Sequence, residues 1–140
     1  MAEIGGDGEL RDILTRYRRI AVVGLSNSPM RPSYGVARYL IGQGYEVAGV
    51  NPNLAGQTVL GRPVYATLGD LPQPPEIVDV FRRSVFVPGV MEQAIAAGAK
   101  VVWTQLGVKD DAAAALGRAA GLMVVQNRCT AIEHERLIGS

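Results

Sequence analysis

Polar side chains follow five short apolar runs in this sequence, and they are the residues whose chemistry suits a small ligand. They carry hydroxyl, amide and guanidinium groups rather than the Lys and Glu that would serve solubility alone. In chain order they are Ser26, Asn27 and Ser28, then Asn51, which Pro52 follows, then Arg82 and Arg83, then Gln105, and finally Asn127 and Arg128. Such groups orient a ligand well but are poor proton carriers near neutral pH. The pattern therefore predicts binding rather than acid–base catalysis, against the simpler alternative that loops are polar anyway.

The turn between Gly24 and Ser33 is the candidate site for a phosphate group. A helix is expected to begin at Ser33, so a phosphate in this turn would meet free backbone N–H groups and the positive end of the helix dipole. The hydroxyls of the turn and Asn27 add donors, and Arg31 adds a charge. A purely structural interpretation, in which Gly24 eases a tight turn and Ser33 caps the helix, is compatible with the first.

Two common phosphate-binding fingerprints are absent. The dinucleotide pattern G-x-G-x-x-G would place its second and third glycines at Ser26 and Pro29. The acidic residue that holds the ribose of NAD is also missing, because the second apolar run ends in Asn51. A Walker loop, G-x-x-x-x-G-K-[ST], is absent as well. The sequence therefore disfavours NAD and nucleoside triphosphates as ligands.

The apolar runs predict the strands that position these side chains. They are Ile20–Gly24, Glu46–Val50, Ile77–Phe81, Val101–Thr104 and Leu122–Val125, with a weaker sixth at Val59–Val64. Most do not alternate polar with apolar residues, which is typical of strands buried on both faces.

Helices are expected between most of the strands. They are Glu9–Tyr17, Ser33–Gln43, Val87–Ala97 with Pro88 in its first turn and Gly98 at its end, Ala112–Ala120 capped by Asp110 or Asp111, and a last helix whose Thr130 and Glu133 have capping-box spacing. Alternating strands and helices predict an α/β fold: a Rossmann-like doubly wound parallel sheet with helices on both faces, commonly in the strand order 3-2-1-4-5-6. The polar groups then gather at the carboxyl edge of the sheet, where such folds bind ligands.

Composition narrows the class of protein. The 140 residues are 48% hydrophobic and suit a single domain over 1–140, with residues 1–8 as a flexible tail. The 14 basic and 13 acidic residues nearly balance, which argues against a nucleic-acid binder. One cysteine and one histidine exclude a Cys-cluster metal site or one that needs two His. No apolar run approaches the roughly 20 residues of a membrane span, and no secretory signal is present, so we expect a cytoplasmic protein.

Several motifs together resemble a known family. Gly49-Val50-Asn51-Pro52, followed by Gly56-Gln57-Thr58, Gly61 and Pro63-Val64, has the residues and spacing of the pattern G-V-x-P…G-Q-T…G…P-V of the succinyl-CoA synthetase α subunit. The segments 31–34, 78–82, 127–129 and 132–134 look like those of the small stand-alone bacterial CoA-binding proteins. Nearly the whole chain after Arg19 is similar to these stand-alone proteins.

The resemblance implies coenzyme A or an acyl-CoA as the ligand. By this resemblance Ser26, Asn27, Ser28 and Pro29 hold the phosphates of CoA, while Thr104, Gln105 and Leu106 contact the rest of the cofactor. Two features depart from the synthetase. Leu54 stands where the synthetase has a CoA-contacting Lys, with Arg31, Arg62 and Arg82 as candidate replacements, and the sequence ends before the synthetase's phosphohistidine domain.

Three functions are therefore compared. The first is a CoA-binding module without its own catalytic residues, acting as a carrier, a sensor or the partner of an acyl-CoA enzyme. The second is an NAD(P)-binding domain of a reductase, and the third is an interaction module that has lost its ligand, for which Leu54 argues. Cys129 is read as a small buried residue rather than a nucleophile, and His134 as a packed or surface residue. A homodimer is compatible with the sequence, which identifies no interface.

Overall fold

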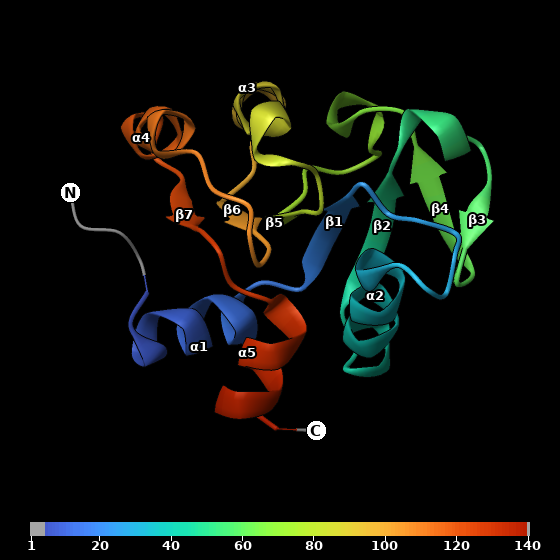
Figure 1. Ribbon diagram of the computed structural model, residues 1–140, viewed down its shortest axis with the longest axis horizontal. Coiled ribbons are helices and arrows are strands. Elements are labelled where there is room, and N and C mark those ends of the chain that lie inside the picture. Colours follow the sequence, from blue (N-terminus) through green and yellow to red (C-terminus); the bar gives the residue numbers. More distant parts are fainter. Residues whose placement is uncertain (1–4, 140) are drawn as a thin grey trace.

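The computed structural model describes residues 5–139 as a seven-stranded sheet in the order β3-β4-β2-β1-β5-β6-β7 (Figure 1). The strands are β1 (Arg19–Val23), β2 (Glu46–Val50), β3 (Thr58–Val59), β4 (Arg62–Tyr65), β5 (Ile77–Val80), β6 (Val101–Thr104) and β7 (Met123–Val125). All pairings are parallel except that of the edge strand β3 with β4. The predicted Rossmann-like α/β fold is confirmed, and the order without β3 is the expected one.

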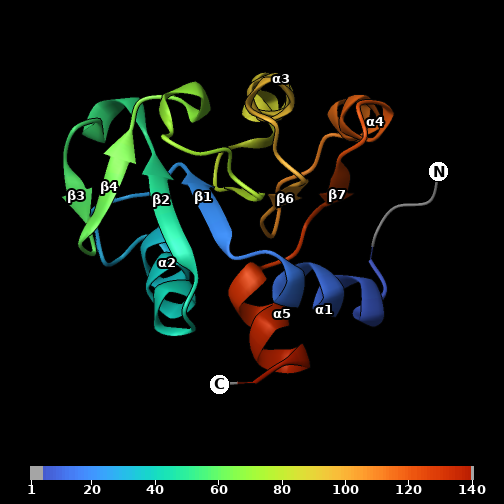
Figure 2. The same ribbon diagram turned by 180° about the vertical axis from the view of Figure 1, so that it is seen from behind.

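Helices cover both faces of the sheet. They are α1 (Asp7–Arg16), α2 (Pro32–Gly42), α3 (Val87–Ala97), α4 (Asp111–Ala119) and α5 (Thr130–Leu137), with short 3₁₀ turns η1 (Pro52–Leu54), η2 (Leu68–Asp70) and η3 (Ser84–Phe86). Figures 1 and 2 show α3 and α4 on one face and α1, α2 and α5 on the other. Residues 1–4 of the expected tail lie outside the described residues, and α1 begins at Asp7. No helix within residues 5–139 has the length and apolar character needed to cross a membrane.

The central strands separate two hydrophobic cores. Along β1, Ile20 and Val22 pack under α1, α2 and α5, while Ala21 and Val23 pack under α3 and α4. Trp103 of β6 is fully buried in the first core, and its indole N–H donates to the Arg128 carbonyl at 2.9 Å. Burying a large apolar side chain contributes about 1.5–3 kcal/mol, so these two cores stabilise the sheet from both sides.

The weak sixth run is not a single strand. Leu60 and Gly61 both have positive φ, 54° and 74°, and form a tight turn between β3 and β4. A two-residue turn of this conformation folds the chain back on itself, which the continuous apolar pattern at Val59–Val64 concealed. The result is a short antiparallel hairpin whose second strand extends the parallel sheet beside β2.

Two predicted helix caps are wrong, and one is confirmed. Ser33 lies one residue inside α2, which begins at Pro32, and its hydroxyl accepts a hydrogen bond from the Ser26 N–H at 3.0 Å. Thr130 also lies inside its helix, as the first residue of α5. Its hydroxyl donates to the Asp79 carboxylate of β5 instead of capping the helix. Asp110 does cap α4, because its Oδ1 accepts from the Ala113 N–H at 2.9 Å.

The strand order changes direction at β1, because β2 pairs with one of its edges and β5 with the other. Gly24, which follows β1, has a φ of +88°, and a Cβ at this position would lie 2.6 Å from the Phe81 carbonyl oxygen. Only glycine fits this close approach without strain. The exits of β1 and β5 can therefore run side by side, at the switch point where open α/β sheets bind ligands.

Candidate functional site

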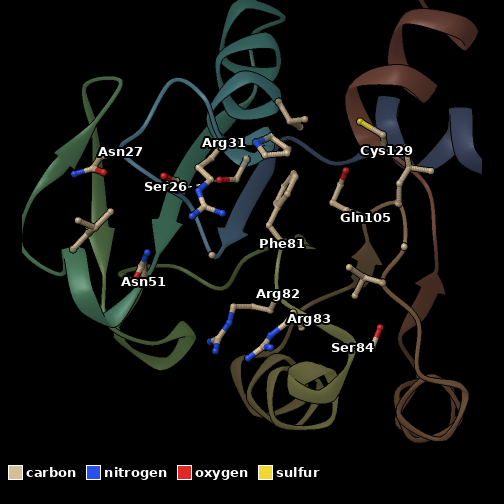
Figure 3. A pocket seen from close by; sticks show the side chains of 18 of the residues that line it. Ser26, Asn27, Arg31, Asn51, Phe81, Arg82, Arg83, Ser84, Gln105 and Cys129 are labelled. Carbon is tan, nitrogen blue, oxygen red and sulfur yellow. Dashed lines mark hydrogen bonds between the residues drawn. The ribbon is translucent and has the colours of Figure 1, made fainter.

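A cleft of about 860 Å³ opens at the carboxyl ends of the parallel strands (Figure 3). Its volume falls in the upper part of the range of about 300–1,000 Å³ typical of ligand sites. The cleft is lined by Gly24, Ser26, Asn27, Arg31, Pro32, Ser33, Val36, Asn51, Asn53, Leu54, Phe81, Arg82, Arg83, Ser84, Gln105, Leu106, Gly107, Val108 and Cys129.

Most residues predicted from the sequence line this cleft. Ten do so: Gly24, Ser26, Asn27, Arg31, Ser33, Asn51, Arg82, Arg83, Gln105 and Leu106. Ser28, Pro52 and Thr104 are not among the lining residues. Thr104 is fully buried, and its hydroxyl donates to the Val108 carbonyl at 2.7 Å. It supports the loop that carries Gln105 from below.

The loop after β1 is held by its own hydroxyls. The Ser26 oxygen accepts from the Ser28 N–H at 3.0 Å, just as the Ser33 oxygen accepts from the Ser26 N–H. Each hydroxyl can still donate its hydrogen to a ligand in the cleft. Arg31 is the N-cap residue of α2 without a side-chain cap bond, and Pro32 follows it with no N–H to offer. The loop is therefore pre-formed, and its donors include hydroxyls as well as backbone groups.

The cleft is strongly positive. Its lining contains Arg31, Arg82 and Arg83 and, among the described residues, no Asp or Glu. The guanidinium groups of Arg82 and Arg83 lie 4.0 and 5.5 Å from the ring centre of Phe86, which orients them without neutralising them. The whole chain carries a formal charge of only +1, so the positive charge is concentrated here.

Leu54, which replaces the lysine of the synthetase pattern, also lines the cleft. Arg31 and Arg82, two of its candidate replacements, line the same cleft. Arg62, the third, lies instead in a smaller cavity of about 310 Å³ near the amino ends of β1 and β2. The positive charge of the cleft therefore comes from arginines in the loops that follow β1 and β5.

Asn51 has a structural role that the sequence did not reveal. Its amide N–H donates to the Leu25 carbonyl at 3.0 Å, and its side-chain oxygen accepts from the Asn53 N–H at 3.0 Å. The side chain thus ties the loop after β1 to the turn after β2. Because this residue is an asparagine whose amide is already bonded, the end of β2 offers no carboxylate for a ribose.

The side of the cleft across from Arg82 and Arg83 is neutral. In Figure 3, Gln105 and Cys129 lie across Phe81 from the guanidinium groups of Arg82 and Arg83. Burial raises the pKa of the Cys129 thiol, and the helix N–H groups of Ala131 and Ile132 only partly oppose this. The thiol therefore stays protonated at neutral pH and is a poor nucleophile.

Sequence reasoning missed several lining residues. They are Pro32, Val36, Asn53, Phe81, Ser84, Gly107 and Val108, and Leu54 and Cys129 were not assigned to the ligand. Phe81 and Ser84 follow β5 and Gly107 follows β6, so the rule that points to strand ends could have found them. His134 lies elsewhere, buried beside Tyr39, whose hydroxyl is 2.8 Å from the His134 Nδ1.

Comparison with known proteins places this geometry in a family. A family model described as the CoA binding domain matches residues 18–135. The chain belongs to this CoA-binding domain family. The resemblance to stand-alone CoA-binding proteins is thereby confirmed. An uncharacterized protein of Bacillus subtilis (strain 168), YneT, is 37% identical over 126 residues, which cover 90% of this chain and 92% of that protein.

Solved structures share the same fold. A hypothetical protein from Pyrococcus horikoshii OT3 is 42% identical, with a TM-score of 0.92 over 99% of this chain and 100% of that one. The dinucleotide-forming acetyl-coenzyme A synthetase 1 of Ca. Korarchaeum cryptofilum is 22% identical, with a TM-score of 0.66 over 76% of this chain and 25% of that chain. The second likeness is one of fold alone.

Proposed function

We propose that this protein binds CoA or an acyl-CoA in the cleft and has no catalytic activity of its own. The observation that carries the proposal is the charge of the cleft: three arginines face it, with no carboxylate among the described lining residues. CoA presents a diphosphate and a ribose phosphate, and each hydrogen bond from a donor to a charged phosphate contributes about 1.5–3 kcal/mol. Membership of the CoA-binding domain family supports the same ligand.

The two sides of the cleft suit the two halves of CoA. We infer that the phosphates bind at the loop after β1, where Ser26, Asn27 and Arg31 supply donors beside the start of α2. The neutral pantetheine arm then extends toward Gln105 and Leu106. In this proposal residues 1–140 act as one domain that carries a single ligand site.

The absence of catalysis is inferred from the chemistry of the lining. Among the described lining residues there is no His, Lys, Tyr, Asp or Glu, the side chains that most often transfer protons in enzymes. The Cys129 thiol, whose pKa is raised, is not an activated nucleophile. A carrier, a sensor or the CoA-holding partner of an acyl-CoA enzyme fits such a site.

An NAD(P)-binding reductase domain is the weaker candidate. The Asn51 amide is occupied by the Leu25 carbonyl and the Asn53 N–H, so the end of β2 lacks the group that holds an NAD ribose. A reductase also needs a proton donor near the nicotinamide, and the lining supplies only neutral amides, hydroxyls and a protonated thiol besides its arginines.

Calorimetric titration with CoA, acetyl-CoA, NAD and ATP tests the proposal. We expect CoA or acetyl-CoA to bind more tightly than NAD and ATP at the same ionic strength. Binding of NAD together with no heat from either CoA compound up to millimolar concentration would overturn it. Absence of binding by all four, with a partner protein co-purifying, would favour the interaction module instead.

A further inference from the structure

Asp79 is a buried carboxylate in the middle of β5, directly below the neutral side of the cleft. Its side chain has no exposed surface, and its neighbours along the strand are valines. Its Oδ1 accepts a hydrogen bond from the Gln105 amide, and its Oδ2 accepts one from the Thr130 hydroxyl at 2.8 Å. Within residues 5–139 no cation pairs with it. A valine at this position would avoid the free-energy cost of removing a carboxylate from water, so the presence of Asp79 needs an explanation.

The hydrogen bonds of Asp79 fix the orientation of the Gln105 side chain. The Gln105 Nε2 donates to Asp79 and is also 3.3 Å from the Thr130 hydroxyl oxygen, so both of its hydrogens point into the protein. An ionised carboxylate only accepts hydrogen bonds, so the NH₂ end of the amide must face it. The amide oxygen must then face the other way. Gln105 lines the cleft, and Figure 3 shows its oxygen on the same side of the cleft as Cys129.

We propose, resting on the CoA-binding function above, that Asp79 is a positioning residue. Together with Thr130 it presents the Gln105 amide to the cleft as a hydrogen-bond acceptor, and this selects a ligand group that carries an N–H or S–H donor. The amides and the free thiol of a pantetheine arm are such groups. A phosphate or a thioester carbonyl, which can only accept, is disfavoured at this position.

The arrangement predicts a dependence on pH. Burial raises the pKa of Asp79 to about 7, although the hydrogen bonds from Thr130 and Gln105 oppose the shift. The partners of Asp79 on the adjacent strands are Val22 and Trp103, which do not titrate. The residue before α5 adds the Cys129 thiol, whose pKa is also raised. Protonated Asp79 can donate to the Gln105 oxygen, so below neutral pH the amide is free to turn over.

The experiment compares CoA with its nucleotide half, 3′-phosphoadenosine 5′-diphosphate, which keeps the phosphate groups but has no pantetheine arm. The dissociation constant of the nucleotide half divided by that of CoA measures what the pantetheine arm contributes to affinity. The outer phosphate of the nucleotide half is terminal and takes up a proton near neutral pH, unlike the esterified phosphate of CoA, so ratios at different pH are always compared with those of a variant. Asp79→Leu keeps the branched shape without the carboxylate, and Gln105→Met keeps the length without the amide. We expect each substitution to reduce the ratio about two- to tenfold, the effect of one hydrogen bond, while the affinity for the nucleotide half stays constant.

The double variant tests whether Asp79 acts through Gln105. We expect Asp79→Leu with Gln105→Met to lose no more than Gln105→Met alone, whereas additive losses would overturn the positioning role. Thr130→Val, which removes only the bridging hydroxyl, serves if Asp79→Leu does not fold, and Thr130→Ser should retain the wild-type ratio. The wild-type ratio divided by the Asp79→Leu ratio should be larger at about pH 8.5 than at about pH 6, because only the ionised carboxylate fixes the amide. Titration of the terminal phosphate affects both proteins alike and cancels.

The outcomes separate the two proposals. A ratio that is insensitive to Asp79→Leu and to Thr130→Val, with the same pH dependence in wild type and variant, contradicts the role of Asp79 but leaves CoA binding intact. Failure of the wild type to bind either CoA or its nucleotide half contradicts the proposed function itself.

Discussion

Replacing Asp79 by Asn should change how the stability of the protein depends on pH. The carboxyl pKa rises from 3.8 to about 7 on folding, so ionised Asp79 destabilises the folded state by about 4 kcal/mol at 1.36 kcal/mol per pKa unit. Because the pKa of Asp79 is higher in the folded state than in the unfolded state, the folded state binds the proton more tightly. The stability that this proton contributes is fully present below the unfolded pKa and is lost as pH rises through 7. From about pH 5 to about pH 8 the loss amounts to roughly 2–3 kcal/mol.

The assay follows urea unfolding by the fluorescence of Trp103, the single tryptophan, which is fully buried in the native protein. The free energy of unfolding is measured for the wild type and Asp79→Asn at several values between about pH 5 and about pH 8. Subtracting one curve from the other removes the contribution of His134 and every other unchanged group. We expect the difference to shift in favour of the variant by about 2–3 kcal/mol as pH rises. A difference that stays constant over this range would show that the Asp79 carboxyl does not have a raised pKa in the folded protein.

Three further perturbations have distinct expected outcomes. Arg31→Ala should weaken CoA binding about ten- to a hundredfold in calorimetry. Arg38→Ala, on the exposed side of the helix that follows Arg31, should leave the affinity unchanged. Equal effects of the two substitutions would show that Arg31 does not bind the ligand. Gly24→Ala should lower the melting temperature, because its Cβ would lie 2.6 Å from a backbone oxygen at a φ of +88°, while Gly8→Ala, with open space around it, should not. Burial lowers the pKa of His134, aided by Arg18, so the contribution of this side chain to stability should fall as pH drops below about 6.5, opposite in sign to that of Asp79. A pH-independent difference in unfolding free energy between wild type and His134→Gln contradicts this.

Five of the strands, β1, β2, β5, β6 and β7, could be predicted because each is a short, mostly buried run rich in Val, Ile or other apolar residues. The two runs at Glu46–Val50 and Val101–Thr104 have the bounds expected from the sequence. The hairpin at β3 and β4 could not be predicted in this way, because the left-handed conformation of Leu60 decides it and leucine gives little sign of such a turn.

The candidate site could be predicted as a region but not residue by residue. The rule that ligands bind at the carboxyl ends of parallel strands found Arg82, Arg83 and Gln105. Thr104, which only the family resemblance assigned to the ligand, lies outside the cleft because adjacent residues at a strand end face opposite sides of the sheet. Likewise, capping-box spacing predicted a cap at Thr130, and only the fold shows that a carboxylate 51 residues away takes its hydroxyl.

A crystal structure of the protein with bound CoA would show whether the cleft is the CoA site. We expect the phosphates to lie within hydrogen-bond distance of the loop after β1 and of the Arg31 guanidinium, with the pantetheine arm beside the Gln105 amide oxygen. CoA bound elsewhere on the surface at saturating concentration, or a cleft left empty, would contradict this expectation.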